Sequence, residues 1–154
     1  MRNETKEIIK KTAHDILRAM NEEASVELEE SGEGGVWVNL TLKDPQLLIG
    51  PKGVYLEAFE RILRASAKKR ISEADGVFIN LDINNYRKKK ASFLKQIAKE
   101  IGDQVSLSKK KVTLEPMSAF ERRIIHLELA SRQDVATESV GEEPERRVEI
   151  RPYP

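Results

Sequence analysis

The chain of 154 residues contains no cysteine, few aromatic residues and no long apolar run. Without cysteine, neither a disulfide nor a thiolate metal site can form. No segment approaches the roughly 20 apolar residues that a membrane-spanning helix requires, and the charged N-terminal segment does not resemble a signal peptide. The sequence therefore predicts a cytoplasmic protein without a membrane-inserted part, whose core is built from aliphatic side chains.

The residue types that catalysis needs are also scarce. The two histidines, His14 and His126, stand more than a hundred positions apart. The sequence shows no metal-ligand cluster, no nucleophile with a neighbouring base, and no phosphate-binding loop of the nucleotidase type. We therefore expect no enzyme activity, no metal and no cofactor.

Charge is abundant but unevenly distributed. The 27 basic and 26 acidic residues leave a net charge of only +1. Between Asn84 and Lys111, nine basic residues oppose two acidic ones, whereas the segment from Glu22 to Glu33 has six acidic residues and no basic one. The basic middle of the chain is where an anionic partner would bind, and the acidic segment is a candidate docking surface for another protein.

Hydrophobic spacing in the first half predicts the order helix, strand, strand, helix, helix, strand. The expected elements are a helix over 3–20, strands over 25–30 and 36–42, a short helical turn over 45–48, a helix ending near Arg70, and a strand over 77–83. The glycine-rich segment 31–35 is expected to be a hairpin turn in which Glu33 repels phosphate.

The second half predicts a further helix and a small sheet. Asn84 or Asn85 is expected to cap the helix, and a short strand over 112–114 follows it. Ser118 with Glu121 is a capping-box signature for a helix over 119–131. Strands over 135–139 and 147–151 are expected to form a hairpin.

The first candidate site is the segment Leu48-Ile49-Gly50-Pro51-Lys52-Gly53, which lies between two predicted helices. Its two glycines let the backbone approach a partner closely, and the helix that follows presents its free N–H groups. Such a helix end attracts phosphate, and Lys52 adds a full positive charge. Ile49 and Val54 are placed to flank bases. Taken alone, this glycine spacing more often marks an ordinary turn between helices.

The second candidate site is Arg122 with His126, which lie four positions apart on one face of the predicted helix. A guanidinium beside an imidazole can hold a phosphate or stack on a base, and protonation of His126 would strengthen that contact. Taken alone, Arg-x-x-x-His is more often structural: the arginine then pairs with a carboxylate, and the histidine lies on a solvated face.

Other basic residues surround the second candidate site. Arg123 directly follows Arg122, and the helix before it has an outward basic stripe. We expect these side chains to support binding of a phosphate backbone, with a merely solvated helix face as the alternative. The supporting residues are Arg87, Lys88, Lys95 and Lys99.

The element order of the first half, with the glycine loop between adjacent helices, resembles the KH domain in its type II arrangement. In that family the loop clamps about four nucleotides through their backbone. Here Pro51 stands where the family usually has a basic or polar residue. The resemblance implies single-stranded RNA as the ligand and residues 49–53 as the contact.

Residues 86–153 resemble the R-three-H domain, a module that binds single-stranded nucleic acid. The resemblance rests on the segments YRKKKASFLKQIA, LEPMSAFERRIIH and DVATESVGEEPERRVEI. It implies that Arg122 and His126, together with Arg123, contact nucleic acid.

A KH domain followed directly by an R-three-H domain is similar to the bacterial Jag family, also called KhpB or SpoIIIJ-associated proteins. The resemblance implies an α+β chain with a type II-like KH domain (αββααβ) over 1–84 and an R-three-H domain over 85–154, in which helices pack on a small antiparallel sheet. It implies a bacterial RNA-binding protein that acts as a post-transcriptional regulator or RNA chaperone, with single-stranded DNA as a second ligand. A small single-KH protein is the expected partner, with an influence on cell elongation or division.

The alternative function is a protein-interaction adaptor linked to a membrane-protein insertase, with the acidic 22–33 hairpin as its docking surface. The RNA-binding expectation depends on one electrostatic premise: Lys52, Arg122 and His126 point outward and are not neutralised by neighbouring carboxylates.

Overall fold

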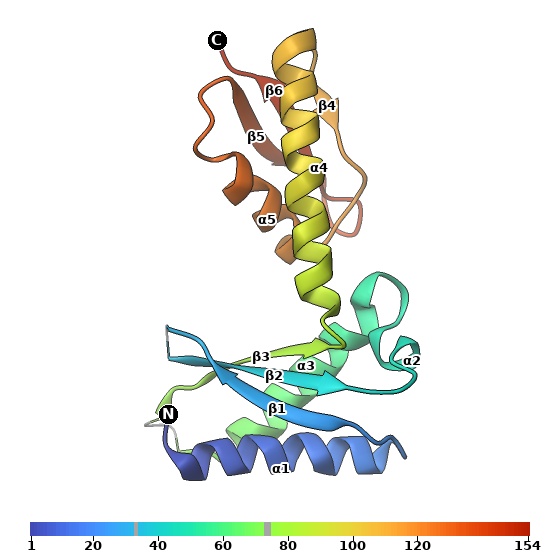
Figure 1. Ribbon diagram of the computed structural model, residues 1–154, viewed down its shortest axis with the longest axis vertical. Helices are drawn as coiled ribbons and strands as arrows, with labels where there is room; N and C mark the ends of the chain where they lie inside the picture. Colours follow the sequence, from blue (N-terminus) through green and yellow to red (C-terminus); the bar gives the residue numbers. More distant parts are fainter. Residues whose placement is uncertain (33, 73–74) are drawn as a thin grey trace. The chain divides into compact units, whose positions relative to one another are not determined.

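Apolar residues at helical spacing form the N-terminal helix, α1 (Asn3–Ala19), as predicted. Its buried face includes Ile9, Ala13 and Leu17, which pack into the first of two cores. Figure 1 shows the chain in a computed structural model, which describes residues 1–32, 34–72 and 75–154.

The described residues form two units, Met1–Arg87 and Lys88–Pro154. Each unit combines helices with a three-stranded sheet, so the predicted α+β class with two small domains is confirmed. The functional boundary after Asn84 stays a prediction. Glu33, which is predicted above to repel phosphate, lies outside the described residues.

The sheet of the first unit has the strand order β1-β2-β3. Strands β1 and β2 pair antiparallel, whereas β2 and β3 pair parallel, with Val38 opposite Leu81. Alternate residues of β2 are buried, which places one face of the sheet against the core. The strands are β1 (Ser25–Glu30), β2 (Gly35–Thr41) and β3 (Phe78–Ile83).

The parallel connection from β2 to β3 runs through two helices and the glycine loop (Figure 1). Residues Leu56, Phe59 and Leu63 bury one face of the longer helix, and Ile62 lies on its exposed face. The order αββααβ that the sequence predicts for this half is confirmed. The connecting elements are α2 (Gln46–Ile49), the 3-10 turn η1 (Pro51–Gly53) and α3 (Val54–Lys68).

The second unit packs helices on an antiparallel sheet with the order β4-β6-β5. Its core joins Leu94 and Ala98 of α4 to Ile125 of α5 and to Val148 and Ile150 of β6. The elements are α4 (Tyr86–Ser108), which starts in the first unit, β4 (Val112–Thr113), α5 (Ala119–Leu129), β5 (Val135–Val140) and β6 (Arg147–Pro152).

Two predicted helix caps have different outcomes. The capping box is confirmed, because the Ser118 hydroxyl accepts from the Glu121 backbone N–H and the Glu121 carboxylate accepts from the Ser118 N–H. At α4, Asn84 does not act as the cap, because its side chain exchanges two hydrogen bonds with the Leu42 backbone. The buried carboxylate of Asp82 instead accepts from the backbone N–H of Arg87.

Candidate nucleic-acid interface

The glycine loop between α2 and α3 has a backbone that requires both of its glycines. Gly50 has φ 70° and ψ 178°, a region that is essentially restricted to glycine. A Cβ atom there would lie 2.5 Å from the ring of Tyr55. Gly53 also has a positive φ, and a Cβ atom there would lie 3.1 Å from the ring of Tyr86. The glycine spacing therefore has a structural cause in this fold, whatever the loop binds.

Between these glycines, Pro51 and Lys52 are exposed, as the sequence predicts. Helix α3 starts directly after Gly53, so the unpaired N–H groups of its first turn lie at the loop. Since the N-cap residue is a glycine, its own side chain does not compete for these donors. The loop thus combines a helix N-terminus with an exposed ammonium group, which is a suitable arrangement for phosphate.

Exposed apolar side chains surround the loop. Leu47 is 74% exposed, and Val54 and Tyr55 are each more than half exposed. Ile49 is instead half-buried and packs against the core of the first unit. Sequence reasoning identified Val54 but missed Leu47 and Tyr55, because neither lies on a predicted core face. An aromatic ring beside a phosphate-attracting turn offers a base a stacking surface.

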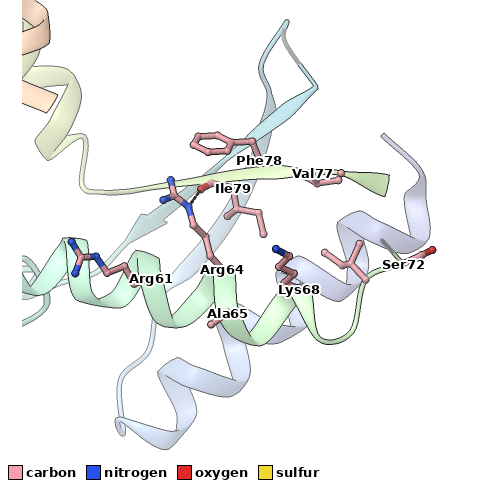
Figure 2. A pocket seen from close by; sticks show the side chains of 10 residues that line it. Arg61, Arg64, Ala65, Lys68, Ser72, Val77, Phe78 and Ile79 are labelled. Carbon is pink, nitrogen blue, oxygen red and sulfur yellow. Dashed lines mark hydrogen bonds between the residues drawn. The ribbon is translucent and has the colours of Figure 1, made fainter. Parts of the chain in front are cut away.

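A second feature of the first unit is a groove of about 580 Å³ between α3 and β3. Figure 2 shows that Arg61, Arg64 and Lys68 extend from α3 on one side, and that Phe78 and Ile79 of β3 form the other side. The Arg64 guanidinium carbon lies 4.7 Å from the centre of the Phe78 ring. The sequence analysis missed this groove, because it depends on a pairing of α3 with β3 that periodicity does not specify.

One side of the groove is stabilised by the buried carboxylate of Glu60. It accepts from the Leu81 backbone N–H at 2.9 Å and from Arg87 at 2.6 Å. Arg64 lies 3.0 Å from the same carboxylate and also donates to the Ile79 carbonyl. Arg87 is therefore part of a half-buried ion-pair network, which differs from the exposed phosphate contact that the sequence suggested.

In the second unit, the Arg122 side chain points inward. It lies on the buried side of α5 with Ile125, and its side chain is only 9% exposed. The guanidinium donates to the Met117 carbonyl at 2.7 Å and pairs with the Glu143 carboxylate at 2.9 Å. The premise that Arg122 points outward without a carboxylate partner is therefore wrong, and the alternative of an arginine paired with an acid holds.

His126 is also held by neighbours, and it does not lie on a solvated face. Its Nδ1 lies 2.7 Å from the Thr137 hydroxyl and its Nε2 lies 2.8 Å from the Ser139 hydroxyl, both on β5. Burial, followed by the positive charge of Arg122, lowers the pKa of His126 below its ordinary value. The imidazole is therefore neutral near pH 7, and protonation does not strengthen a phosphate contact there.

This lowered pKa makes a testable prediction. The folded second unit favours the neutral imidazole, so His126 stabilises the fold above about pH 6.5 and loses that contribution as the pH falls through its folded pKa. In an NMR titration, the ring proton signal of His126 should have a midpoint below 6.5. The variant His126→Gln assigns the signal, and a midpoint at or above 6.5 would contradict the assigned burial.

The remaining predicted basic residues differ in their surroundings. Arg123 and Lys95 are exposed. Lys88 is exposed and makes a further interaction. Lys99 lies 3.3 Å from Glu128, but its side chain remains 67% exposed. Arg123 is thus the member of the second candidate site whose charge is presented to solvent.

The described residues also limit other kinds of site. Among them, no group of three histidine, aspartate or glutamate side chains is placed to hold a metal ion. Within the same ranges, every helix is too short or too polar to cross a bilayer.

Comparison with known proteins places these features in a class. Residues 92–152 match the family model of the R-three-H domain, which covers the second unit from α4 to β6. The class defined by the fold and the match is therefore a two-unit α+β protein with an R-three-H domain.

Curated relatives make the assignment more specific. The chain is 39% identical over 137 residues to the RNA-binding protein KhpB of Clostridium symbiosum, and 33% identical over 137 residues to that of Bacillus subtilis. It is 32% identical over 139 residues to the KhpB of Lactiplantibacillus plantarum. Each match includes 88% of this chain, and the matches cover 60%, 64% and 42% of the respective relatives. The predicted relationship to the Jag or KhpB family is confirmed over this stretch, and the chain spans about half the length of these relatives.

Proposed function

We propose that this protein binds single-stranded RNA in the bacterial cytoplasm, without a catalytic step, as a post-transcriptional regulator or RNA chaperone. The observation that carries the proposal is the exposed Lys52 at the uncapped start of α3, next to exposed Tyr55 and Leu47. The names of the KhpB relatives and the R-three-H match support RNA as the ligand.

In the first unit, the RNA backbone lies against the loop formed by residues 49–53. Phosphate oxygens accept from the N–H groups of the α3 start and from Lys52. Bases contact the apolar side chains around the loop, and the basic groove between α3 and β3 continues this surface with Arg61 and Lys68. Because stacking and phosphate contacts are largely independent of sequence, this arrangement favours single strands of many sequences.

The second unit adds its own contact around α5. Arg123 supplies exposed positive charge, and Lys88, Lys95 and Lys99 extend it along α4. Arg122 and His126 lie beneath this surface, where they join α5 to β5 and to the turn before β6. Each unit thus binds a separate stretch of RNA, and single-stranded DNA is the competitor with which RNA preference is measured.

The test is the salt dependence of binding to a labelled single-stranded RNA, measured by fluorescence anisotropy. Each phosphate contact lowers the slope of log K against log salt by roughly 0.7 for a single strand. Arg123→Ala should therefore reduce the slope by about one contact and weaken binding to all sequences alike. A wild-type chain whose binding did not depend on salt would contradict the proposal.

A second candidate function is docking of a small single-KH partner protein. The observation that favours it is the edge position of β1, whose exposed side chains include Glu27 and Glu29. An edge strand can pair with a strand of another chain. Retention of the partner in a pull-down after nuclease treatment supports direct docking, and loss of the partner supports a link through RNA.

A further inference from the structure

The ion pair between Arg122 and Glu143 joins a buried cation to an exposed anion. The Arg122 side chain is 9% exposed, whereas that of Glu143 is 60% exposed. Glu143 belongs to the turn between β5 and β6, and its Oε1 lies 2.9 Å from an outer guanidinium nitrogen. One end of the guanidinium is thus fixed inside the unit by the Met117 carbonyl, and the other is covered by a carboxylate at the surface.

The charges at this position cancel. Arg122 contributes one positive charge and Glu143 one negative charge, while His126 uses both ring nitrogens against the hydroxyls of Thr137 and Ser139. The cluster as it stands therefore has little net attraction for an anion. A phosphate diester, however, presents two oxygens to a guanidinium in the same manner as a carboxylate.

We propose that Glu143 is a specificity-determining residue, because its carboxylate occupies the position on Arg122 that a phosphate of bound RNA takes. This inference rests on the proposed RNA-binding function. Binding at this position requires the Glu143 side chain to move into solvent, where it is rehydrated. Arg122 keeps its bond to Met117 and exchanges one anionic partner for another, so a buried charge is never left unpaired.

The exchange selects for a long polyanion. A single phosphate must displace Glu143 from a contact that is held intramolecularly, at a high effective concentration. A phosphate of an RNA chain that is already held by Arg123 and the α4 lysines has a similar advantage. The carboxylate thus disfavours free phosphate and short nucleotides, and permits longer single strands.

The test compares two neighbouring glutamates in the same turn. Glu143→Gln and Glu142→Gln each remove one negative charge, and Glu142 is likewise exposed. We expect Glu142→Gln to raise RNA affinity by less than about twofold, as a general effect of charge. Glu143→Gln should raise it by about fivefold or more, because a neutral amide competes less well for a guanidinium than a carboxylate does. Equal affinities for the two variants would overturn the proposal.

A third variant guards against loss of structure. Glu143→Asp keeps the charge but shortens the side chain by one methylene, so it weakens the contact with Arg122 without changing the net charge. If Glu143→Gln fails to fold by circular dichroism, a gain of RNA affinity in Glu143→Asp over wild type supports the proposal, and an unchanged affinity overturns it.

Inorganic phosphate separates this proposal from the proposed function. It should raise the melting temperature of Glu143→Gln more than that of Glu142→Gln, whether or not RNA binds, because the uncovered guanidinium accepts the ion. If the wild type binds no RNA, the proposed function fails and the phosphate result alone decides on the site. If the wild type binds RNA and both glutamine variants respond alike, the role of Glu143 fails and RNA binding stands.

Discussion

Replacing Pro51 and Lys52 together with aspartate should weaken binding of single-stranded RNA by about tenfold to a hundredfold at moderate salt. A hydrogen bond to a charged group contributes about 1.5–3 kcal/mol, and about 1.4 kcal/mol corresponds to a factor of ten. The double variant removes the ammonium group and places two carboxylates at the start of α3. The fold should persist, because both side chains are exposed and Lys52 has φ 53°, a left-handed conformation that aspartate tolerates.

The matched control makes the same change of charge elsewhere in the first unit. Lys10→Asp combined with Asn21→Asp also adds three negative charges, and both positions are exposed. Asn21 has a positive φ, so aspartate suits it as well. In anisotropy titrations the control should lose far less affinity than the loop variant. Equal losses would mean that the loop acts only through net charge, and unchanged binding of the loop variant would remove it from the interface.

Glu60→Ala is expected to destabilise the first unit by about 3–5 kcal/mol, the usual result of removing one partner from a buried ion pair. The carboxylate is almost fully buried and is shared by Arg64, Arg87 and the backbone N–H of Leu81. Its removal leaves two guanidinium groups and a strand N–H without that acceptor. Trp37 is the single tryptophan of the chain and lies on β2, so its fluorescence in a urea titration reports unfolding of this unit.

Glu57→Ala provides the comparison for this prediction. Glu57 lies one turn earlier on α3 and is partly exposed. A surface substitution of this kind usually changes the free energy of unfolding by about 0.5 kcal/mol or less. If Glu60→Ala had an effect of that size, the network would not hold α3 against β3.

Sequence periodicity predicted the elements well, because each depends on contacts between residues close in the chain. The strand β1 has the predicted bounds of 25–30, and the Ser118 capping box forms as expected. The cap of α4 was missed because it depends on Asp82, which sits inside the preceding strand. A strand residue with a buried carboxylate gives no signal of this role in the sequence.

The candidate sites were harder to predict, since their chemistry depends on long-range pairing. The exposure of Lys52 follows from its place in a tight loop. The partner of Arg122 stands in a turn that follows the next strand, so the sequence left open whether an acid would neutralise the arginine. The groove was not foreseen for the same reason, because Arg64 and Phe78 meet only after α3 has packed against β3.

The side chains of α3 have a consequence for self-association. Along the outer edge of β3, Arg64 binds the Ile79 carbonyl and Glu60 binds the Leu81 N–H, so these groups are not available to a further strand. Strand addition to this sheet is therefore directed to β1, where Glu27 and Glu29 are repeated in every copy. Two copies meeting edge to edge would bring like charges together. The sheet is thus protected against polymerisation of the chain with itself, while a strand rich in lysine or arginine can still join it.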